Sequence, residues 1–316
     1  MRKNVLSIVT ALLTASFLYA LNDDPEYLKA RKNGGVARLL IKVVNDEGVA
    51  VSGASIDILM GMNFREKSYS IKGMSDSSGS FLAEGKTTGN EIVINVQKDG
   101  YYESTKKICL IEMGKEHKVN NGCWQPWGIE VPLYLREVRQ PSDLVTFNQY
   151  IAVPATNTWM GFDMQMKDWT APFGKGKYSD FEMLLTWDGK PQYTTKETSL
   201  EMRFIEPLAG CYAFTNFPDC EFGGAYLADT NRIVHITRMF SSGSNDGTPW
   251  QKGLDESQSL VLRTRCKETG DGNILTANYS TIKSIGVSAG WKGSVKMWMR
   301  YYYNPVPNSL NLEPKR

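Results

Sequence analysis

Histidine is nearly absent from this sequence, which contains only His117 and His235. A histidine-based metal cluster is therefore not predicted, and no cysteine spacing resembles a zinc site. A serine or cysteine triad would have to recruit one of the same two residues. His235 lies in Ile233-Val234-His235-Ile236, a pattern that predicts a histidine on a strand face, and His117 lies among charged residues typical of a loop. No catalytic residue, metal or cofactor is predicted.

An excess of positive charge is also lacking. The chain has 36 Lys and Arg against 34 Asp and Glu. Arg2 and Lys3 fall within the first twenty residues, which carry no acid, so the remaining chain is balanced at 34 against 34. Nucleic-acid binders normally carry a basic excess that displaces phosphate counterions. A nucleic-acid partner is therefore not expected.

Long apolar runs are absent except at the start. Arg2 and Lys3 precede a mostly apolar stretch from Val5 to Leu18, and Ala20 offers a small residue for cleavage. The pattern predicts a signal peptide over residues 1–20, with an uncleaved anchor as the alternative, because the run is short for a bilayer span. After cleavage we expect no stable membrane insertion. The mature protein is predicted to be extracytoplasmic: periplasmic, on the cell surface or secreted.

The sequence has five cysteines, an odd number, so at least one cannot pair within the chain. An exported protein permits disulfides. Cys109 with Cys123, and Cys211 with Cys220, are the closest pairs in sequence and are the disulfide candidates.

Alternating apolar and polar residues and frequent turn dipeptides predict an all-β fold. The length predicts two domains, a first β-sandwich over 21–138 and a second over 142–316, joined by a linker at 139–141. A short helix is expected near Asp24 to Lys32, and Pro132 places the last strand of the first domain at a sheet edge. The expected strands are Val36–Val44, Ala54–Leu59, Tyr69–Met74, Glu91–Val96, Ile129–Leu135, Val145–Ile151, Phe181–Trp187, Ser199–Ile205, Ile233–Thr237, Ser259–Thr264, Ile274–Ile285 and Gly293–Tyr303.

Three segments of the first domain carry a family resemblance: Asp46 to Ile56 (DEGVAVSGASI), Ser75 to Phe81 (SDSSGSF) and Val96 to Tyr101 (VQKDGY). In this order they resemble the carboxypeptidase regulatory-like domain, a transthyretin-like β-sandwich of exported bacterial proteins. The family usually has proline near Val51. The resemblance implies a fold and an accessory role as a spacer or assembly module, and no chemistry.

Two features of the first domain have competing interpretations. Asp76 is expected to form a turn with its own backbone rather than to bind calcium. Trp124 and Trp127 flank Pro126, and we expect the pair to seal one end of the sandwich rather than to form an exposed patch.

The second domain contains the most distinctive segment, from Gly161 to Phe181. It resembles a run in exported bacterial proteins that also carry the first type of domain, and this resemblance implies no activity. Gly174-Lys175-Gly176-Lys177 is interpreted as a flexible basic loop, since its spacing does not match a phosphate-binding P-loop.

Candidate ligand-binding residues follow from aromatic rings beside glycine, proline or lysine, where burial is difficult to arrange. A second platform is predicted on one face of the last strand, where aromatic and basic residues alternate with the core face. The candidates are Trp169, Phe173, Lys175 and Trp250, with Trp298 and Tyr302 as the second platform.

Two function hypotheses remain open. The first is a non-catalytic binding or surface-assembly protein, whose second domain could stack a glycan or other surface polymer on its aromatic rings. A protein partner could also add to a sheet edge. The second hypothesis is an extracellular polysaccharide hydrolase that uses paired carboxylates.

Overall fold

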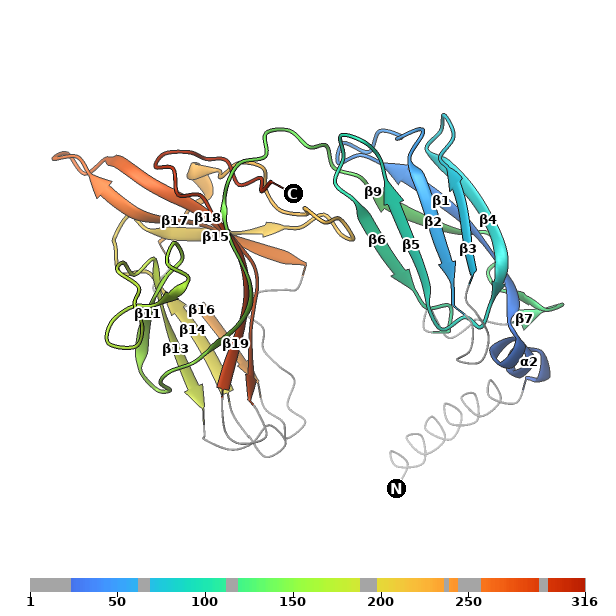
Figure 1. Ribbon diagram of the computed structural model, residues 1–316, viewed down its shortest axis with the longest axis horizontal. Helices are drawn as coiled ribbons and strands as arrows, with labels where there is room; N and C mark the ends of the chain where they lie inside the picture. The colour runs from blue at the N-terminus through green and yellow to red at the C-terminus, as the bar shows by residue number, and fades with distance from the viewer. Residues whose placement is uncertain are drawn as a thin grey trace, which may run out of the picture. The chain divides into compact units, whose positions relative to one another are not determined.

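The computed structural model describes residues 24–61, 69–111, 119–187, 198–235, 239–243, 257–289 and 295–315. These residues form mainly β-strands, so the all-β prediction is confirmed (Figure 1). Unit 1 comprises Met1–Val138 with Asp219–Phe222, and unit 2 comprises Arg139–Pro218 with Gly223–Arg316. The predicted domain limits and their tandem order stay predictions. The predicted signal peptide, His117 and Trp250 lie outside the described residues.

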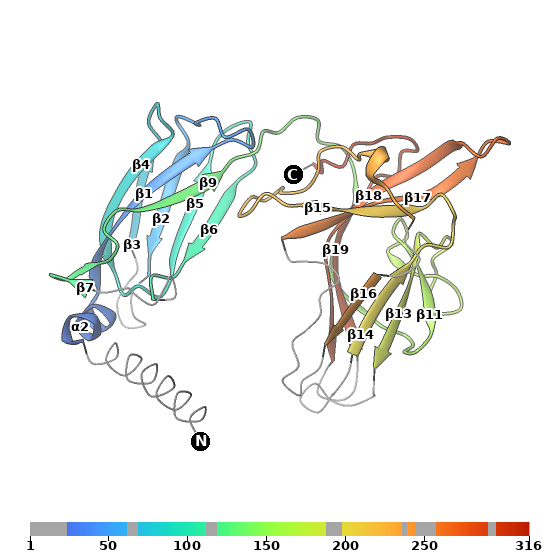
Figure 2. The same cartoon turned by 180° about the vertical axis from the view of Figure 1, so that it is seen from behind.

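Unit 1 contains two sheets (Figure 2). The first has the order β4-β1-β8-β7, and β9 also pairs with β1; its strands are β1 (Gly35–Val44), β4 (Ser80–Thr87), β7 (Val119–Asn120), β8 (Cys123–Trp124) and β9 (Ile129–Tyr134). The second has the order β3-β2-β5-β6, with β2 (Ser55–Met60), β3 (Tyr69–Met74), β5 (Ile92–Gln97) and β6 (Ser104–Ile108).

Alternation builds the core of unit 1. Every second residue of β1 is buried, and Leu39, Ile41 and Val43 share one apolar cluster with Ile56 and Ile58 of β2. Because β1 and β2 belong to different sheets, the two sheets enclose a common core, as in a sandwich. In β9, Pro132 lies on a strand that pairs only with β1 in the described part of the chain, so its predicted edge position is confirmed.

The expected helix forms as α2 (Pro25–Asn33). Asp24 caps it, because its Oδ1 accepts hydrogen bonds from the backbone N–H groups of Glu26 at 2.9 Å and Tyr27 at 3.4 Å. The Tyr27 ring packs edge-on against Trp124, with 5.9 Å between centroids. The helix therefore covers part of the core of unit 1. Within the described ranges, no helix combines the length and apolar character needed to cross a bilayer.

Two local predictions in unit 1 have different outcomes. Asp76 Oδ1 accepts hydrogen bonds from the N–H groups of Ser78 and Ser80, which confirms the turn interpretation. The prediction for the two tryptophans holds for one of them. Trp124 is buried and donates its indole N–H to Thr87 O, whereas Trp127 is partly exposed. Only Trp124 therefore seals the sandwich.

Unit 2 also contains two sheets. The β19 sheet has the order β10-β19-β18-β17-β15, with β10 (Val145–Ala152), β15 (Gly210–Thr215), β17 (Gln258–Glu268), β18 (Ile274–Ala289) and β19 (Val295–Tyr303). The β13 sheet has the order β12-β11-β13-β14-β16, with β11 (Trp159–Asp163), β12 (Asp168–Trp169), β13 (Phe181–Trp187), β14 (Thr198–Arg203) and β16 (Met239–Gly243). A short 3-10 turn, η1, spans Thr230–Arg232.

The core of unit 2 lies between these sheets. Met297, Met299 and Tyr301 of β19 share an apolar cluster with Phe162 and Met183 of the β13 sheet. A smaller cluster lies on the opposite face of β17 and β18, where residues near the C-terminus cover the sheet; it includes Val261, Ala277, Tyr279 and Leu312.

One predicted strand of the second domain is wrong. In Ile233–Thr237, only Val234 pairs, through an isolated bridge to Cys211, while residues 236–238 lie outside the described part. His235 is exposed, and its Nδ1 lies 2.9 Å from Ala209 O. The histidine therefore lies in an irregular segment and not on a strand face.

The residues predicted as a linker are held by hydrogen bonds. The carboxylate of the buried Glu313 accepts the backbone N–H groups of Arg139 at 2.8 Å and Gln140 at 2.6 Å. The Ser142 N–H donates to Glu313 O at 2.9 Å, and the Lys315 N–H donates to Ser142 O at 3.1 Å. The first residues of unit 2 thus form a short ladder with its last described residues.

We expect Glu313→Gln to loosen this ladder. The new amide group presents a donor to a backbone donor, so one buried N–H loses its partner at a cost of about 1–3 kcal/mol. Trypsin should then cleave after Arg139 faster than in the unchanged protein, as followed by gel densitometry. Asp143→Asn is the matched control, because it removes an exposed ion pair to Lys315 that contributes about 0–1 kcal/mol. Equal cleavage rates in both variants would show that Glu313 does not hold the segment.

Candidate functional site

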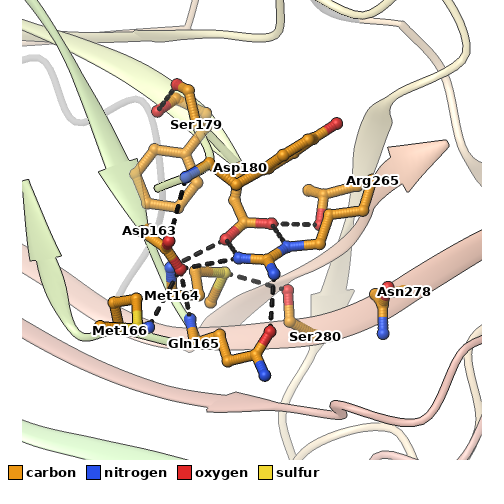
Figure 3. Close-up of polar contacts among 12 residues, drawn as sticks. Asp163, Met164, Gln165, Met166, Ser179, Asp180, Arg265, Asn278 and Ser280 are labelled. Atoms are coloured by element: carbon orange, nitrogen blue, oxygen red, sulfur yellow. Dashed lines mark hydrogen bonds and ion pairs between the residues drawn. The ribbon is translucent and has the colours of Figure 1, made fainter. Parts of the chain in front are cut away.

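The densest polar cluster in unit 2 joins its two sheets. Arg265 of β17 bonds to Asp163 at the end of β11 and to Asp180 just before β13 (Figure 3). Its Nε lies 2.8 Å from Asp180 Oδ1, and its Nη2 lies 2.9 Å from Asp180 Oδ2 and 2.7 Å from Asp163 Oδ1. Its Nη1 donates to Gln165 Oε1 at 2.6 Å. We call Asp163, Asp180 and Arg265 the Arg265 network.

Both carboxylates are almost completely buried, and each accepts several hydrogen bonds from the protein. Asp163 accepts the backbone N–H groups of Gln165, Met166, Lys177 and Tyr178. Asp180 accepts the Met164 N–H at 2.8 Å and the Thr264 hydroxyl at 2.8 Å. A buried carboxylate is stable only when it is paired and hydrogen-bonded in this way. The network therefore anchors the backbone on both sides of each aspartate.

Two tyrosine rings flank the Arg265 guanidinium. Its central carbon lies 4.9 Å from the Tyr178 centroid and 5.2 Å from the Tyr303 centroid. Burial by itself would lower the pKa of Arg265, but the hydrogen bonds and the negative charge of Asp180 raise it above its ordinary value. The guanidinium therefore remains charged, and two carboxylates and two aromatic rings hold it in place.

The loop interpreted as flexible and basic is tightly packed instead. A Cβ at Gly174 would lie 2.3 Å from Trp169 O, and a Cβ at Gly176 would lie 2.8 Å from Asp163 Cβ. The Lys175 N–H donates to Asp168 Oδ2 at 2.9 Å, and the Gly176 N–H donates to Trp169 O at 2.8 Å. The glycines permit close approach of the backbone to the Arg265 network, so the interpretation as a flexible loop was wrong.

This geometry limits the chemistry available at the Arg265 network. Asp163 and Asp180 both bond to the same guanidinium nitrogen, and neither carboxylate is exposed. A catalytic acid/base pair must exchange protons with substrate or water. These two carboxylates instead accept hydrogen bonds from groups inside the protein. Among the described residues, no group of histidine, cysteine, aspartate and glutamate side chains is arranged to hold a metal ion. The network is a structural anchor.

We expect Asp180→Asn to destabilise unit 2 strongly. The amide keeps the shape but removes the charge opposite Arg265, and breaking a buried ion pair costs about 3–5 kcal/mol. Urea unfolding, monitored by circular dichroism, measures this loss. Glu182→Gln is the matched control, since its ion pair with Arg203 is partly exposed and should contribute less than about 1 kcal/mol. Equal losses in the two variants would contradict the anchoring role.

The first predicted binding group is not an open aromatic surface. Trp169 is only 3% exposed, packs edge-on against Phe162 and donates its indole N–H to Ala152 O at 2.9 Å. Phe173 is partly buried against the same core, and Lys175 is exposed. Trp250 lies outside the described residues. The expectation that the Trp169 ring is exposed was therefore wrong, because long-range packing buries a ring whose neighbours in sequence suggested exposure.

The second predicted platform is placed on the outer face of the β19 sheet, and its two rings differ. Tyr302 is 9% exposed, and its hydroxyl accepts a hydrogen bond from Arg300 Nη2 at 3.1 Å. Trp298 is half-buried and contacts Tyr150 of β10, with 4.9 Å between ring centroids. Tyr150 is 57% exposed. The open part of the platform is thus Trp298 with Tyr150, a residue that sequence reasoning missed.

Strand register explains why these two rings meet. Trp298 pairs with Tyr150 on one side and with Gly286 of β18 on the other. A Cβ at Gly286 would meet nothing within 4 Å, so the space beside Trp298 is open on that side. The next row of the same face carries Asn148, Arg300 and Ser284. We call Tyr150 and Trp298 the aromatic pair, and this outer face the platform.

An arginine-capped tryptophan on the β13 sheet provides a contrast. On the β13 sheet the Arg203 guanidinium lies 4.0 Å from the Trp159 ring centroid and also bonds to Glu182. The arginine therefore covers that ring, whereas no cation is recorded over the aromatic pair in the described part of the chain.

Gly286 to Gly290 has the spacing Gly-x-Ser-x-Gly of a hydrolase nucleophile elbow. That elbow is a sharp turn between a strand and a helix. Here Gly286 to Ala289 continue β18, and Ala289 still pairs with Val295 of β19. Gly286 to Ala289, with the serine of the run, are part of a regular strand, which is not the strand-to-helix turn of an elbow.

No disulfide joins the five cysteines, all of which lie in the described part of the chain. Cys109 Sγ is directed at Gly89 O, and Cys123 Sγ at Asn121 O. Cys211 is buried in the core of unit 2, while Cys220 belongs to the segment assigned to unit 1. The two predicted pairings are therefore not present in the structure.

Thiol labelling tests this arrangement. Burial raises the pKa of Cys211 to about 12; burial and the charge of Glu206 raise that of Cys266 to about 11. Since the thiolate is the reactive form, its fraction at pH 8 is on the order of 10⁻⁴ for Cys211 and 10⁻³ for Cys266. We expect these two to react slowest with iodoacetamide in the native protein, as measured by mass spectrometry. Labelling of Cys266 should rise about tenfold per pH unit up to pH 10.

Denatured protein purified without reductant should titrate five thiols with Ellman's reagent. A titre of one or three would instead show that disulfides form.

Comparisons with known proteins assign no family. No family model matches the chain, and no curated protein matches it. A 3-chlorocatechol 1,2-dioxygenase from Rhodococcus opacus is 12% identical with a TM-score of 0.26, over 34% of this chain and 62% of that chain. The catechol 1,2-dioxygenase from Acinetobacter radioresistens is 10% identical with a TM-score of 0.27, over 35% of this chain and 55% of that chain. The chain thus spans less than two thirds of either dioxygenase.

A variant of the shaft pilin SpaA from Lactobacillus rhamnosus GG is 9% identical with a TM-score of 0.23, over 77% of this chain and 92% of that chain. At such TM-scores, none of these likenesses carries an inference about function.

Proposed function

We propose that this protein works outside the cytoplasm as a non-catalytic binding protein, and that unit 2 holds a carbohydrate chain on the platform. The observation that carries the proposal is the aromatic pair: Tyr150 is 57% exposed and lies 4.9 Å from Trp298, centroid to centroid, on an open sheet face. Aromatic rings that adjoin each other on a surface form a contiguous apolar patch, and such patches often mark binding sites. A use in binding accounts for their exposure.

The neighbours of the aromatic pair suit a sugar. Flat rings provide apolar faces on which sugar rings stack, and a small number of polar groups fix the orientation. Asn148 and Ser284 lie in the next row of the same face and offer amide and hydroxyl groups for sugar hydroxyls. An open strand face also admits a long polymer, which a closed pocket would not.

The hydrolase alternative has less support. Glycoside hydrolysis requires two carboxylates that reach the substrate, one of which holds a proton. The carboxylates that unit 2 brings together, Asp163 and Asp180, are buried and bonded to Arg265. On the platform, the described residues of β10, β18 and β19 include no carboxylate. The geometry therefore favours binding over cleavage.

For unit 1 we propose an accessory role as a spacer or assembly module. Its two sheets enclose one apolar core, and the turn at Asp76 is an ordinary hydrogen-bonded turn. This agrees with the fold that the resemblance to the carboxypeptidase regulatory-like domain implies. Export of the chain rests on the predicted signal peptide.

The proposal is tested by affinity electrophoresis in gels that contain soluble neutral or acidic polysaccharides. We expect the mature chain to be retarded by at least one polymer, and Trp298→Ala to weaken that binding about fivefold to tenfold. This corresponds to the loss of roughly 1 kcal/mol from one stacked ring. The urea midpoint of the variant should remain close to that of the unchanged protein, because the ring is half-buried on an outer face.

Trp127→Ala is the matched control, since Trp127 is a partly exposed tryptophan of unit 1. It should leave retardation unchanged. Retardation that survives Trp298→Ala, or the absence of binding to every polymer, would overturn the proposal.

A further inference from the structure

We infer that the carbohydrate held on the platform is an acidic polysaccharide with about one carboxylate per sugar, as in a polyuronate. This inference rests on the proposed function and adds the chemical class of the ligand. It is carried by the arrangement of charge around the aromatic pair. Lys296 and Arg300 lie on the same strand face as Trp298, two residues before it and two residues after it.

The described residues of the platform include two basic side chains and no acidic side chain. Its residues come from three paired strands, at alternate positions except at the register shift of β18 between Ile282 and Ser284. Their side chains are neutral except for Lys296 and Arg300. The described outer-face residues are Thr146, Asn148, Tyr150 and Ala152 of β10, Thr281, Ser284 and Gly286 of β18, and Lys296, Trp298, Arg300 and Tyr302 of β19. No ion pair is recorded for Lys296 or Arg300 with any described acid; Arg300 instead donates to the Tyr302 hydroxyl.

On two other sheet faces a cation is paired with an acid. In unit 1, Lys72 of β3 lies 2.9 Å from Asp57 of β2. In unit 2, Arg203 of β14 lies 2.6 Å from Glu182 of β13. The chain as a whole is nearly neutral, with a formal net charge of +2. Two cations with no acidic partner among the described residues, on either side of the half-buried Trp298 ring, therefore form a local excess that an anionic ligand would complement.

Spacing selects the type of anion. Residues two apart on a strand face are separated by about 7 Å, so the two cations are separated by about 13 Å with Trp298 between them. Such sparse charge suits a polymer that alternates apolar ring faces with single carboxylates. Arginine also binds a carboxylate through two parallel hydrogen bonds. A densely sulfated polymer would call for a higher density of cations.

A single-stranded nucleic acid also has both features, because its bases stack on aromatic rings and its phosphates are negatively charged. Proteins that bind it use a basic groove along the backbone. The platform offers two cations in a nearly neutral protein, so the described charges favour the polyuronate.

The test measures binding of the full mature chain to alginate oligosaccharides by isothermal titration calorimetry at 20 mM and 300 mM NaCl. Dextran oligosaccharides, heparin oligosaccharides and oligo-dT are the other probes. We expect alginate to bind tightest, with an affinity that falls at least threefold at the higher salt concentration. Lys296→Gln and Arg300→Gln should each weaken alginate binding about threefold to tenfold. Lys29→Gln, which neutralises an exposed lysine on α2 of unit 1, should leave it unchanged.

The outcomes separate the two proposals. Equal binding of dextran and alginate, sensitive to Trp298→Ala but not to Lys296→Gln or Arg300→Gln, would overturn the acidic ligand and leave carbohydrate binding intact. Tighter binding of heparin or oligo-dT than of alginate would also overturn it. If no carbohydrate binds, the proposed function fails as well. The circular dichroism spectrum of each variant must match that of the unchanged protein. Arg300→Lys, which keeps the positive charge, must bind alginate more tightly than Arg300→Gln if positive charge is the cause.

Discussion

The structure of unit 2 depends on the requirement that two buried carboxylates must not be left without a partner. Asp163 and Asp180 come from the β13 sheet, and the guanidinium that satisfies both comes from the β19 sheet. Two further bonds cross between the sheets nearby, because Tyr301 donates its hydroxyl to Met164 O and the Ser280 hydroxyl contacts Met164 Sδ. Apolar packing between the sheets is non-directional, and these bonds add directed contacts between the two layers.

The same strand serves the core and the platform. In β19, Met297, Met299 and Tyr301 are buried between the sheets, while Lys296, Trp298 and Arg300 lie on the outer face. A slip of one residue would exchange these two sets, so the register that packs the core also aligns the aromatic pair. The packing of the inner face thereby determines which side chains the outer face presents. In β19, the side chains proposed to bind ligand differ from those that stabilise the core, but both sets are carried by the same strand.

Much of the fold follows from short-range pattern. Alternation predicted most strands, and the amphipathic face of Lys296 to Tyr302 was predicted from the same period. What could not be predicted depends on residues far apart in the chain. Arg265 is 85 residues from Asp180 and 102 from Asp163, and no local signal joins them. Trp169 lies beside residues typical of a loop, yet its indole N–H reaches Ala152 O and its ring enters the core. Tyr150 could be placed beside Trp298 only once the pairing of β10 with β19 was known.

Arg265 adopts φ 54°, a left-handed backbone conformation in which glycine would be less strained. It lies at the irregular stretch of β17, where the pairing with β18 shifts after Thr264. The backbone of this position thus favours glycine, while its side chain must be a planar cation with several donors. A single substitution of Arg265 that relieves the backbone leaves two buried carboxylates without their cation, and a single loss of either aspartate removes one of the two carboxylates that hold the guanidinium. In evolutionary terms these three positions should covary, changing together or not at all.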